Sequence, residues 1–296
     1  MRHGTYSIVA RDPETGELGA AVQSHWFSVG SLCVWARPGV GAVATQSVVE
    51  PAYGPDALDR LADDIGAQQA LGELLAADQL AAVRQVAVVD ARGGISAHTG
   101  PDCIPHAGHV TGEHHSAQAN MMARETVPQA MSDAFENATG PLSERLFAAL
   151  LAAEGEGGDV RGRQSAALVV VGPEGEPWRR TVDLRVEDHA DPLGELRRLL
   201  TLQRAYDLAG AADELLAAGR VEEAGERYRE ASRIAPESDE LLFWAGLALA
   251  QAGDLNGGVQ AVRQAAERQP NWLVLLDRLS ADFAPAGAQV RDRLSR

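Results

Sequence analysis

A threonine near the start of the sequence is the residue best suited to nucleophilic chemistry. Thr5 follows Gly4 and opens a run of strand-forming residues, 5–12. In a chain that began at Thr5, this residue would carry a free α-amino group beside its hydroxyl. The pKa of such an amine, about 7.7–8.0, suits a base near neutral pH, and a hydroxyl with its own amine as base is a known nucleophile. We predict that Thr5 attacks an amide carbonyl once residues 1–4 are removed; the alternative is an ordinary strand threonine.

A second group of polar residues is expected to stabilise the transition state or to bind the substrate. Asn120 lies where a predicted strand, 114–120, meets a predicted helix, so that its side-chain N–H or a nearby backbone N–H could form an oxyanion hole. The alternative is a turn asparagine. Arginine binds carboxylates through two parallel hydrogen bonds, so the glycine-rich segment 154–163 is either a candidate anion site or a solvated loop. The candidates for substrate contacts are Ser24, Arg37, His98, His109, Gln118, Asp159, Arg161, Gln164 and Ser165.

Histidines and one cysteine gather between residues 98 and 115, where they suggest two other kinds of site. Zinc prefers such ligands, but their spacing matches no standard zinc finger, and we expect neither a metal nor another cofactor. Cys103 with a histidine partner is an alternative nucleophile, although its surroundings do not resemble those of a cysteine protease. His98 and His109 are therefore predicted to contact the substrate.

The composition excludes several classes of function. The net charge of −16 argues against a nucleic-acid partner. All 26 basic residues are arginine, and the absence of lysine excludes a Schiff base and the phosphate-binding P-loop. Two cysteines are too few for a disulfide framework, and no apolar run has the length of a signal peptide or a membrane helix. We expect a cytoplasmic protein that does not bind a membrane.

Periodicity predicts the elements that must position these residues within 1–190. Alternating apolar residues and turn residues predict hairpins that join 5–12 to 17–24, 32–37 to 40–46, 83–89 to 95–99 and 164–171 to 181–186. Helices are expected over 55–77, divided at Gly66, and over 121–137 and 141–154, with 100–112 irregular. Such segregated runs of strands and helices favour an α+β fold with antiparallel sheets and helices outside.

From residue 191 onward the pattern is helical and repeats itself. Gly219 and Gly253 lie 34 residues apart, as do Ala231 and Ala265, and Pro236 and Pro270. This spacing resembles two tetratricopeptide repeats, with a linking helix over 193–205 and a capping helix over 272–283. We therefore divide the chain into domains 1–190 and 191–296. The second is expected to bind a protein partner or to support self-association into a homo-oligomer.

The first domain also carries segments that match a known family. They include Thr5–Asp12, Trp35–Gln46, Pro51–Pro55, Arg84–Asp90, His98–Gly100, Ala117–Met121, Gly162–Ala167 and Val182–Val186. With these segments the sequence resembles the bacterial family called domain of unknown function 1028, whose fold is similar to that of N-terminal-nucleophile (Ntn) hydrolases. The resemblance implies an αββα sandwich of two antiparallel sheets flanked by helices. The Gly4–Thr5 junction also resembles the self-cleavage point of Ntn precursors, whereas Ala119 stands where the family often has glycine.

Two functions of different class follow. The first is hydrolysis of a small-molecule amide, cyclic or N-acyl, with Thr5 as nucleophile and base. The second is a non-catalytic interaction module, in which the sandwich is a scaffold and the helical repeats bind a partner.

Overall fold

The computed structural model describes residues 4–296, which form two compact units. The first unit ends at Arg197 and the second begins at Arg198, so the boundary lies within helix α6 (Pro192–Ala217). The first unit contains strands and helices, and the second is helical throughout. The predicted α+β class with a helical C-terminal region is confirmed.

The strands described in the first unit form two antiparallel sheets, and all four predicted hairpins are confirmed. The six-stranded sheet has the order β10 (Val182–Val186), β9 (Ser165–Val171), β2 (Leu18–Ser24), β1 (Thr5–Arg11), β8 (His115–Asn120) and β7 (Gly108–Thr111). The four-stranded sheet has the order β3 (Val34–Arg37), β4 (Gly41–Ser47), β5 (Arg84–Asp90) and β6 (Ile95–Thr99).

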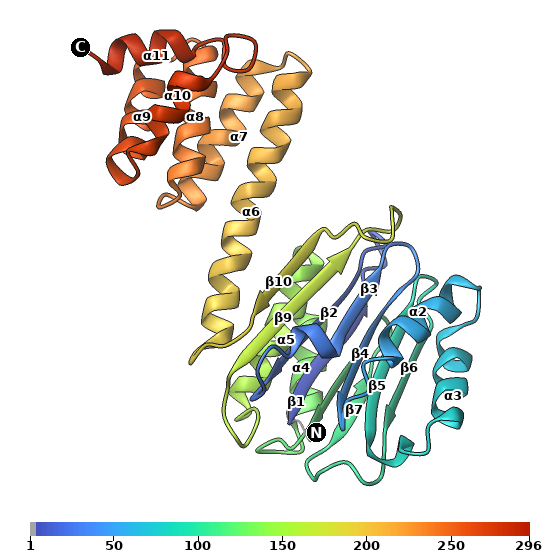
Figure 1. Ribbon diagram of the computed structural model, residues 1–296. Coiled ribbons are helices and arrows are strands. Elements are labelled where there is room, and N and C mark those ends of the chain that lie inside the picture. The colour runs from blue at the N-terminus through green and yellow to red at the C-terminus, as the bar shows by residue number, and fades with distance from the viewer. Residues whose placement is uncertain (1–3) are drawn as a thin grey trace. The chain divides into compact units, whose positions relative to one another are not determined.

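Helices cover the outer face of each sheet, and the inner faces pack against each other (Figure 1). Strand side chains alternate between the two environments, because successive residues point to opposite faces. Val86 and Val88 point outward and pack against Leu58 of a covering helix, whereas Val22 and Val89 belong to the core between the sheets. The helices are α1 (Gly30–Cys33), α2 (Tyr53–Ala62) and α3 (Ala67–Ala77), the short 3-10 helix η1 (Ala81–Val83), and α4 (Val127–Asn137) and α5 (Leu142–Gly155).

Two segments of the first unit differ from the prediction. Residues 100–112, predicted to be irregular, contain β7, which pairs with β8 at the edge of the six-stranded sheet. This strand has four residues, too few for its alternation to be recognised beside Gly108. The helix predicted over 121–137 begins only at Val127, because Met121 has a φ of 58°, which is incompatible with a right-handed helix.

The second unit consists of helices joined by short turns, and small residues bring two of them close together. A Cβ built on Gly246 of α8 would lie 2.8 Å from the carbonyl oxygen of Gly258 in α9, so only glycine fits there. The predicted linking helix extends to Ala217. The predicted capping helix, 272–283, ends early, at Arg278, and a further helix that was not predicted follows Pro285. After α6 come α7 (Val221–Ile234), α8 (Asp239–Gln251), α9 (Leu255–Arg268), α10 (Asn271–Arg278) and α11 (Gly287–Leu294).

Among the described residues, no helix has both the length and the apolar character that crossing a bilayer requires.

A buried histidine makes the stability of the first unit depend on pH. His115 of β8 is 1% exposed, its Nε2 lies 2.8 Å from the Ser132 hydroxyl, and its ring packs on Phe135. Burial, together with the charges of Arg145 and His114, lowers the pKa of His115 from 6.5 to about 4. The unfolded chain therefore binds a proton that the folded chain does not, so this contribution to stability is complete above pH 6.5 and is lost as the pH falls toward 4.

We expect the free energy of unfolding to fall by on the order of 1–3 kcal/mol over this interval because of His115. Urea unfolding at several pH values measures it. Between pH 6.5 and 4, the free energy of unfolding should depend less on pH in His115→Gln than in the wild type. It should depend on pH as in the wild type in His189→Gln, which replaces an exposed histidine. Equal slopes in the wild type and His115→Gln would contradict the assignment.

Candidate active site

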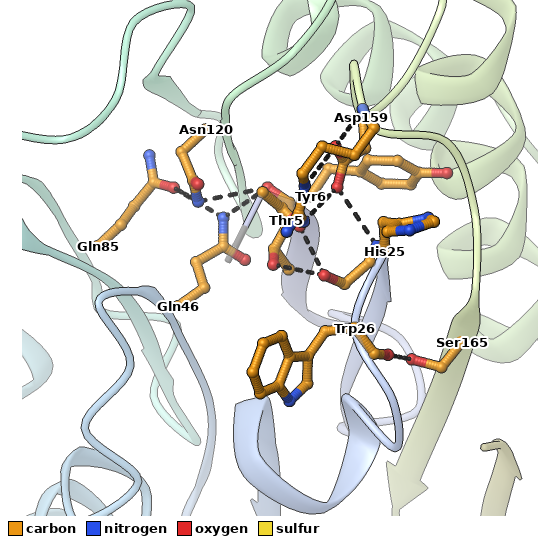
Figure 2. A network of polar contacts seen from close by, with 12 residues as sticks. Thr5, Tyr6, His25, Trp26, Gln46, Gln85, Asn120, Asp159 and Ser165 are labelled. Carbon is orange, nitrogen blue, oxygen red and sulfur yellow. Dashed lines mark hydrogen bonds and ion pairs between the residues drawn. The ribbon is translucent and has the colours of Figure 1, made fainter. Parts of the chain in front are cut away.

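Strand register places four polar side chains in one row across the six-stranded sheet. Thr5 lies opposite Ser24 on one side and opposite Asn120 on the other, and Ser24 lies opposite Ser165. These residues continue the inward alternation of Val9, Val22 and Ala167, so the row faces the other sheet. Each of the four is at most 1% exposed. We call Asn120, Thr5, Ser24 and Ser165 the threonine row; Figure 2 shows three of them by label.

The peptide bond before Thr5 is held by two donors. The Thr5 hydroxyl donates to Ser24 Oγ at 3.0 Å, and Ser24 Oγ in turn donates to the carbonyl oxygen of Gly4 at 2.5 Å. Arg161 Nη2 donates to the same carbonyl oxygen at 2.7 Å. Two donors on one carbonyl oxygen, one of them charged, stabilise the negative charge that develops there when a nucleophile attacks the carbon.

A buried carboxylate fixes Arg161 in this place. Asp159 Oδ1 accepts from the backbone N of Arg161 at 2.9 Å and from its Nε at 3.1 Å, and Oδ2 accepts from Nη2 at 2.7 Å. The Asp159 side chain has no exposed surface. The backbone N of His25 also donates to Oδ2, at 3.3 Å, as Figure 2 shows. Asp159 therefore orients the guanidinium toward Gly4.

Glutamines of the four-stranded sheet hold the other side of Thr5. Gln46 of β4 donates from Nε2 to the Thr5 carbonyl oxygen at 3.1 Å and to Oε1 of Gln85 at 2.7 Å. Asn120 donates to the same Oε1 at 3.0 Å and to the Thr5 carbonyl oxygen at 3.5 Å. The amides of both sheets thus meet at the backbone of Thr5 (Figure 2).

A second inward row extends this polar layer. Ser7 lies opposite Gln118, donates to Oε1 of Gln46 at 2.7 Å and accepts from Nε2 of Gln118 at 3.2 Å. Gln118 also donates to the carbonyl oxygen of Ala44 at 3.0 Å. Buried polar groups are costly unless they form hydrogen bonds. In this part of the interior, polar side chains replace apolar ones and bond to one another in a network. The predicted Gln118 therefore supports the strand of Thr5 from within.

The other predicted residues form their side-chain hydrogen bonds with groups other than Gly4 and Thr5. Ser165 donates to the carbonyl oxygen of Trp26 and accepts from the backbone N of Val29, and so fixes the segment after β2. Arg37, predicted to contact the substrate, instead bonds Asp59 of α2 at 2.7 Å. The remaining contacts are Gln164 with Asp188, His98 with the Ala81 carbonyl oxygen, and His109 with the Thr99 hydroxyl.

The two cysteines are buried and free. Burial raises the pKa of the Cys103 thiol, whose Sγ lies 3.4 Å from the carbonyl oxygen of Arg84, and raises the pKa of Cys33 to about 12. The thiol form, which is a poor nucleophile, therefore prevails at both positions. Within residues 4–296, no three His, Cys, Asp or Glu side chains gather closely enough to hold a metal ion.

Three residues of the site, Ser7, Gln46 and Gln85, are not among those predicted from the sequence. Each is a polar residue at an inward strand position and has a small or apolar inward neighbour two residues away, namely Val9, Ala44 and Ala87. A polar residue at an inward position of a strand therefore indicates a buried polar site, and this pattern could have identified them from the sequence. The predicted removal of residues 1–4 concerns a segment of which only Gly4 lies within the described residues.

Comparisons with known proteins agree with this fold. The model of a family of unknown function, DUF1028, matches residues 5–196. The crystal structure of protein SPO2555 from Silicibacter pomeroyi, assigned to that family, is similar with a TM-score of 0.61 and 33% sequence identity, over 67% of this chain and 88% of that chain. Anbu (ancestral beta-subunit) from Yersinia bercovieri matches with a TM-score of 0.35 and 11% identity, over 73% of this chain and 96% of that chain; a similarity this low carries no argument. No curated protein matches the chain.

Proposed function

Because the chain belongs to the family of unknown function DUF1028, whose description names no reaction, we propose a function from the geometry around Thr5. The first unit is an Ntn-type amidohydrolase that acts on a small-molecule amide, with Thr5 as nucleophile after loss of residues 1–4. The layers of helix, sheet, sheet and helix support an Ntn-hydrolase-like fold. The observation that carries the proposal is the Gly4 carbonyl oxygen held between Ser24 and Arg161, directly before a threonine hydroxyl.

The same geometry supports removal of residues 1–4 by self-cleavage. Thr5 Oγ attacks the Gly4 carbonyl carbon and passes its proton to Ser24, which passes its own proton to the Gly4 oxygen along the observed hydrogen bonds. Arg161 donates to the same oxygen and stabilises the negative charge that develops there before the proton arrives. As the Gly4–Thr5 C–N bond breaks, the proton leaves the Gly4 oxygen for the Thr5 nitrogen, and an ester joins Gly4 to Thr5 Oγ. Water hydrolyses this ester and leaves Thr5 with a free amine.

The cleaved chain then repeats this chemistry on an external amide. The Thr5 amine takes the hydroxyl proton as Oγ attacks the substrate carbonyl. Ser24 and Arg161, no longer bonded to Gly4, donate to the substrate oxygen. The C–N bond breaks, the amine product leaves with the proton, and water hydrolyses the acyl ester on Thr5. Gln46 and Asn120 hold the Thr5 backbone in place throughout.

Intact-mass measurement of purified protein tests the proposal first. We expect wild-type chains to begin at Thr5. Ser24→Ala and Arg161→Gln each remove one donor from the Gly4 oxygen, so both should slow the appearance of the cleaved chain about 100- to 1,000-fold. Ser31→Ala and Arg92→Gln, at exposed positions of the same unit, should cleave at the wild-type rate. A wild-type protein that keeps Gly4 attached indefinitely would refute self-cleavage.

Features of the helical unit favour the second candidate function, an interaction module. The 34-residue spacing and the close approach of α8 and α9 at Gly246 support a tetratricopeptide-like arrangement. A cavity of about 400 Å³ in this unit is lined mostly by apolar residues, among them Leu216, Trp244 and Phe283, together with Asp213 and Gln251. Phe283 is 69% exposed. An exposed aromatic beside an apolar hollow is typical of surfaces that bind protein segments.

A further inference from the structure

The α-carbon of Gly4 faces the Asp159–Arg161 pair at close range. A substituent built on this carbon in the L configuration would lie 2.8 Å from Asp159 Oδ2, 2.9 Å from Oδ1 and 3.0 Å from Arg161 Nη2. In the proposed mechanism, the acyl part of an external substrate takes the place of Gly4, since its carbonyl oxygen uses the same two donors. The atom bonded to the α-carbon of that acyl group therefore meets the same pair of side chains.

These distances discriminate between kinds of atom. They are too short for a methyl or methylene group but normal for hydrogen bonds that involve an oxygen. A hydroxyl at this point donates to the Asp159 carboxylate, and its oxygen lies beside the positive guanidinium of Arg161, whose Nη2 already donates to the carbonyl oxygen and to Asp159. An ammonium group would donate to Asp159 but face the positive guanidinium, and an alkyl group would pair with neither. The Asp159 side chain has no exposed surface while Gly4 is in place, and a substrate that fills the place of Gly4 would exclude water from this bond in the same way.

On the premise of the proposed function, we infer that the acyl group of the substrate carries a hydroxyl on its α-carbon. The substrate class is then the amides of α-hydroxy acids. Thr5 Oγ forms an ester with the acyl carbon, the amide C–N bond breaks, and the amine leaves with the proton that the Thr5 amine had accepted. Water then cleaves the ester, releases the α-hydroxy acid and restores the Thr5 hydroxyl. The Ser24 and Arg161 donors hold the carbonyl oxygen, and Asp159 selects the hydroxyl.

Three p-nitroanilides of nearly equal size test this inference on the protein that begins at Thr5 and keeps both units. Their acyl groups are glycolyl, glycyl and propionyl, which place OH, NH₃⁺ and CH₃ on the α-carbon. We expect kcat/KM for release of p-nitroaniline to be at least tenfold higher for the glycolyl compound than for either of the others. In Asp159→Asn the ratio of glycolyl to propionyl rates should fall toward one. Asp64→Asn, a surface replacement of the same kind, should keep the wild-type ratio.

The outcomes separate the inference from the proposed function. Hydrolysis of all three compounds at similar rates, lost in Thr5→Ala, would overturn the hydroxyl preference and leave the amidohydrolase proposal standing. Absence of Thr5-dependent hydrolysis for all three would contradict both. Because the comparison among the three compounds needs only the unaltered protein, it decides the matter even where Asp159→Asn folds poorly.

Discussion

Replacing Thr5 with alanine is expected to leave residues 1–4 attached and to reduce amide hydrolysis at least about a thousandfold, because the variant lacks the attacking oxygen. Thr5→Ser keeps a hydroxyl at the same place and should retain both cleavage and measurable hydrolysis. Intact mass reports the first effect, and steady-state kinetics on a chromogenic amide reports the second. The fold should survive, since the alanine side chain gives up one hydrogen bond, to Ser24.

Thr15→Ala provides the matched control for this prediction. Thr15 lies in the exposed turn between β1 and β2, and its hydroxyl bonds the nearby Glu17 side chain. We expect this variant to be cleaved and to hydrolyse amides as the wild type does. A Thr5→Ala protein that matched the wild type in kcat/KM would exclude the threonine nucleophile and would favour the scaffold alternative.

Replacing Gln85 with leucine should produce the largest loss of stability. Gln85 Oε1 accepts from Gln46 and Asn120, and its Nε2 lies within 2.9 Å of the Thr99 hydroxyl and of the Ala119 carbonyl oxygen. Leucine has a similar size but accepts no hydrogen bond, so one N–H of Gln46 and one N–H of Asn120 lose their acceptor, at about 1–3 kcal/mol for each unpaired group. We expect the free energy of unfolding of the first unit to fall by about 3–5 kcal/mol.

Hydrogen exchange is the suitable measurement, since peptides from β4 and β5 report on the first unit separately from the helical one. Gln69→Leu is the control. Gln69 lies on the exposed face of α3 and bonds the neighbouring Glu73, so its loss should change exchange little. Unchanged protection of β5 in Gln85→Leu would mean that the buried amide layer contributes little to stability.

Local sequence patterns were sufficient to predict most elements of this fold. Alternation and turn residues identify β1 with β2 and β5 with β6, because both features act within about ten residues. Short elements are harder to predict. The strand β7 has four residues beside glycine, and α11 follows a proline that obscures the helical pattern. In both places the chain's contacts with distant elements decide the structure, and local propensity does not.

The candidate site could be predicted only in part, because it also depends on contacts between segments that are far apart in the sequence. Thr5, Ser24 and Asn120 were selected by type and local position, and strand register brings them together. Sequence does not reveal that Arg161, separated from Gly4 by 157 positions, donates to its carbonyl oxygen. Nor does the sequence reveal that Gln85 of the other sheet accepts a hydrogen bond from the side-chain amide of Asn120. Such contacts depend on how two sheets stack, which alternation within a single strand does not encode.

The position of Thr5 at the first residue of β1 has a practical consequence for chemical labelling. The sequence contains no lysine, and arginine does not react with amine-specific acylating reagents. A chain that begins at Thr5 therefore has one primary amine, located in the interior row of the sheet and not on the surface. A small isotope-labelled acylating reagent that enters the candidate site would therefore mark it alone, at a defined stoichiometry, without any engineered tag.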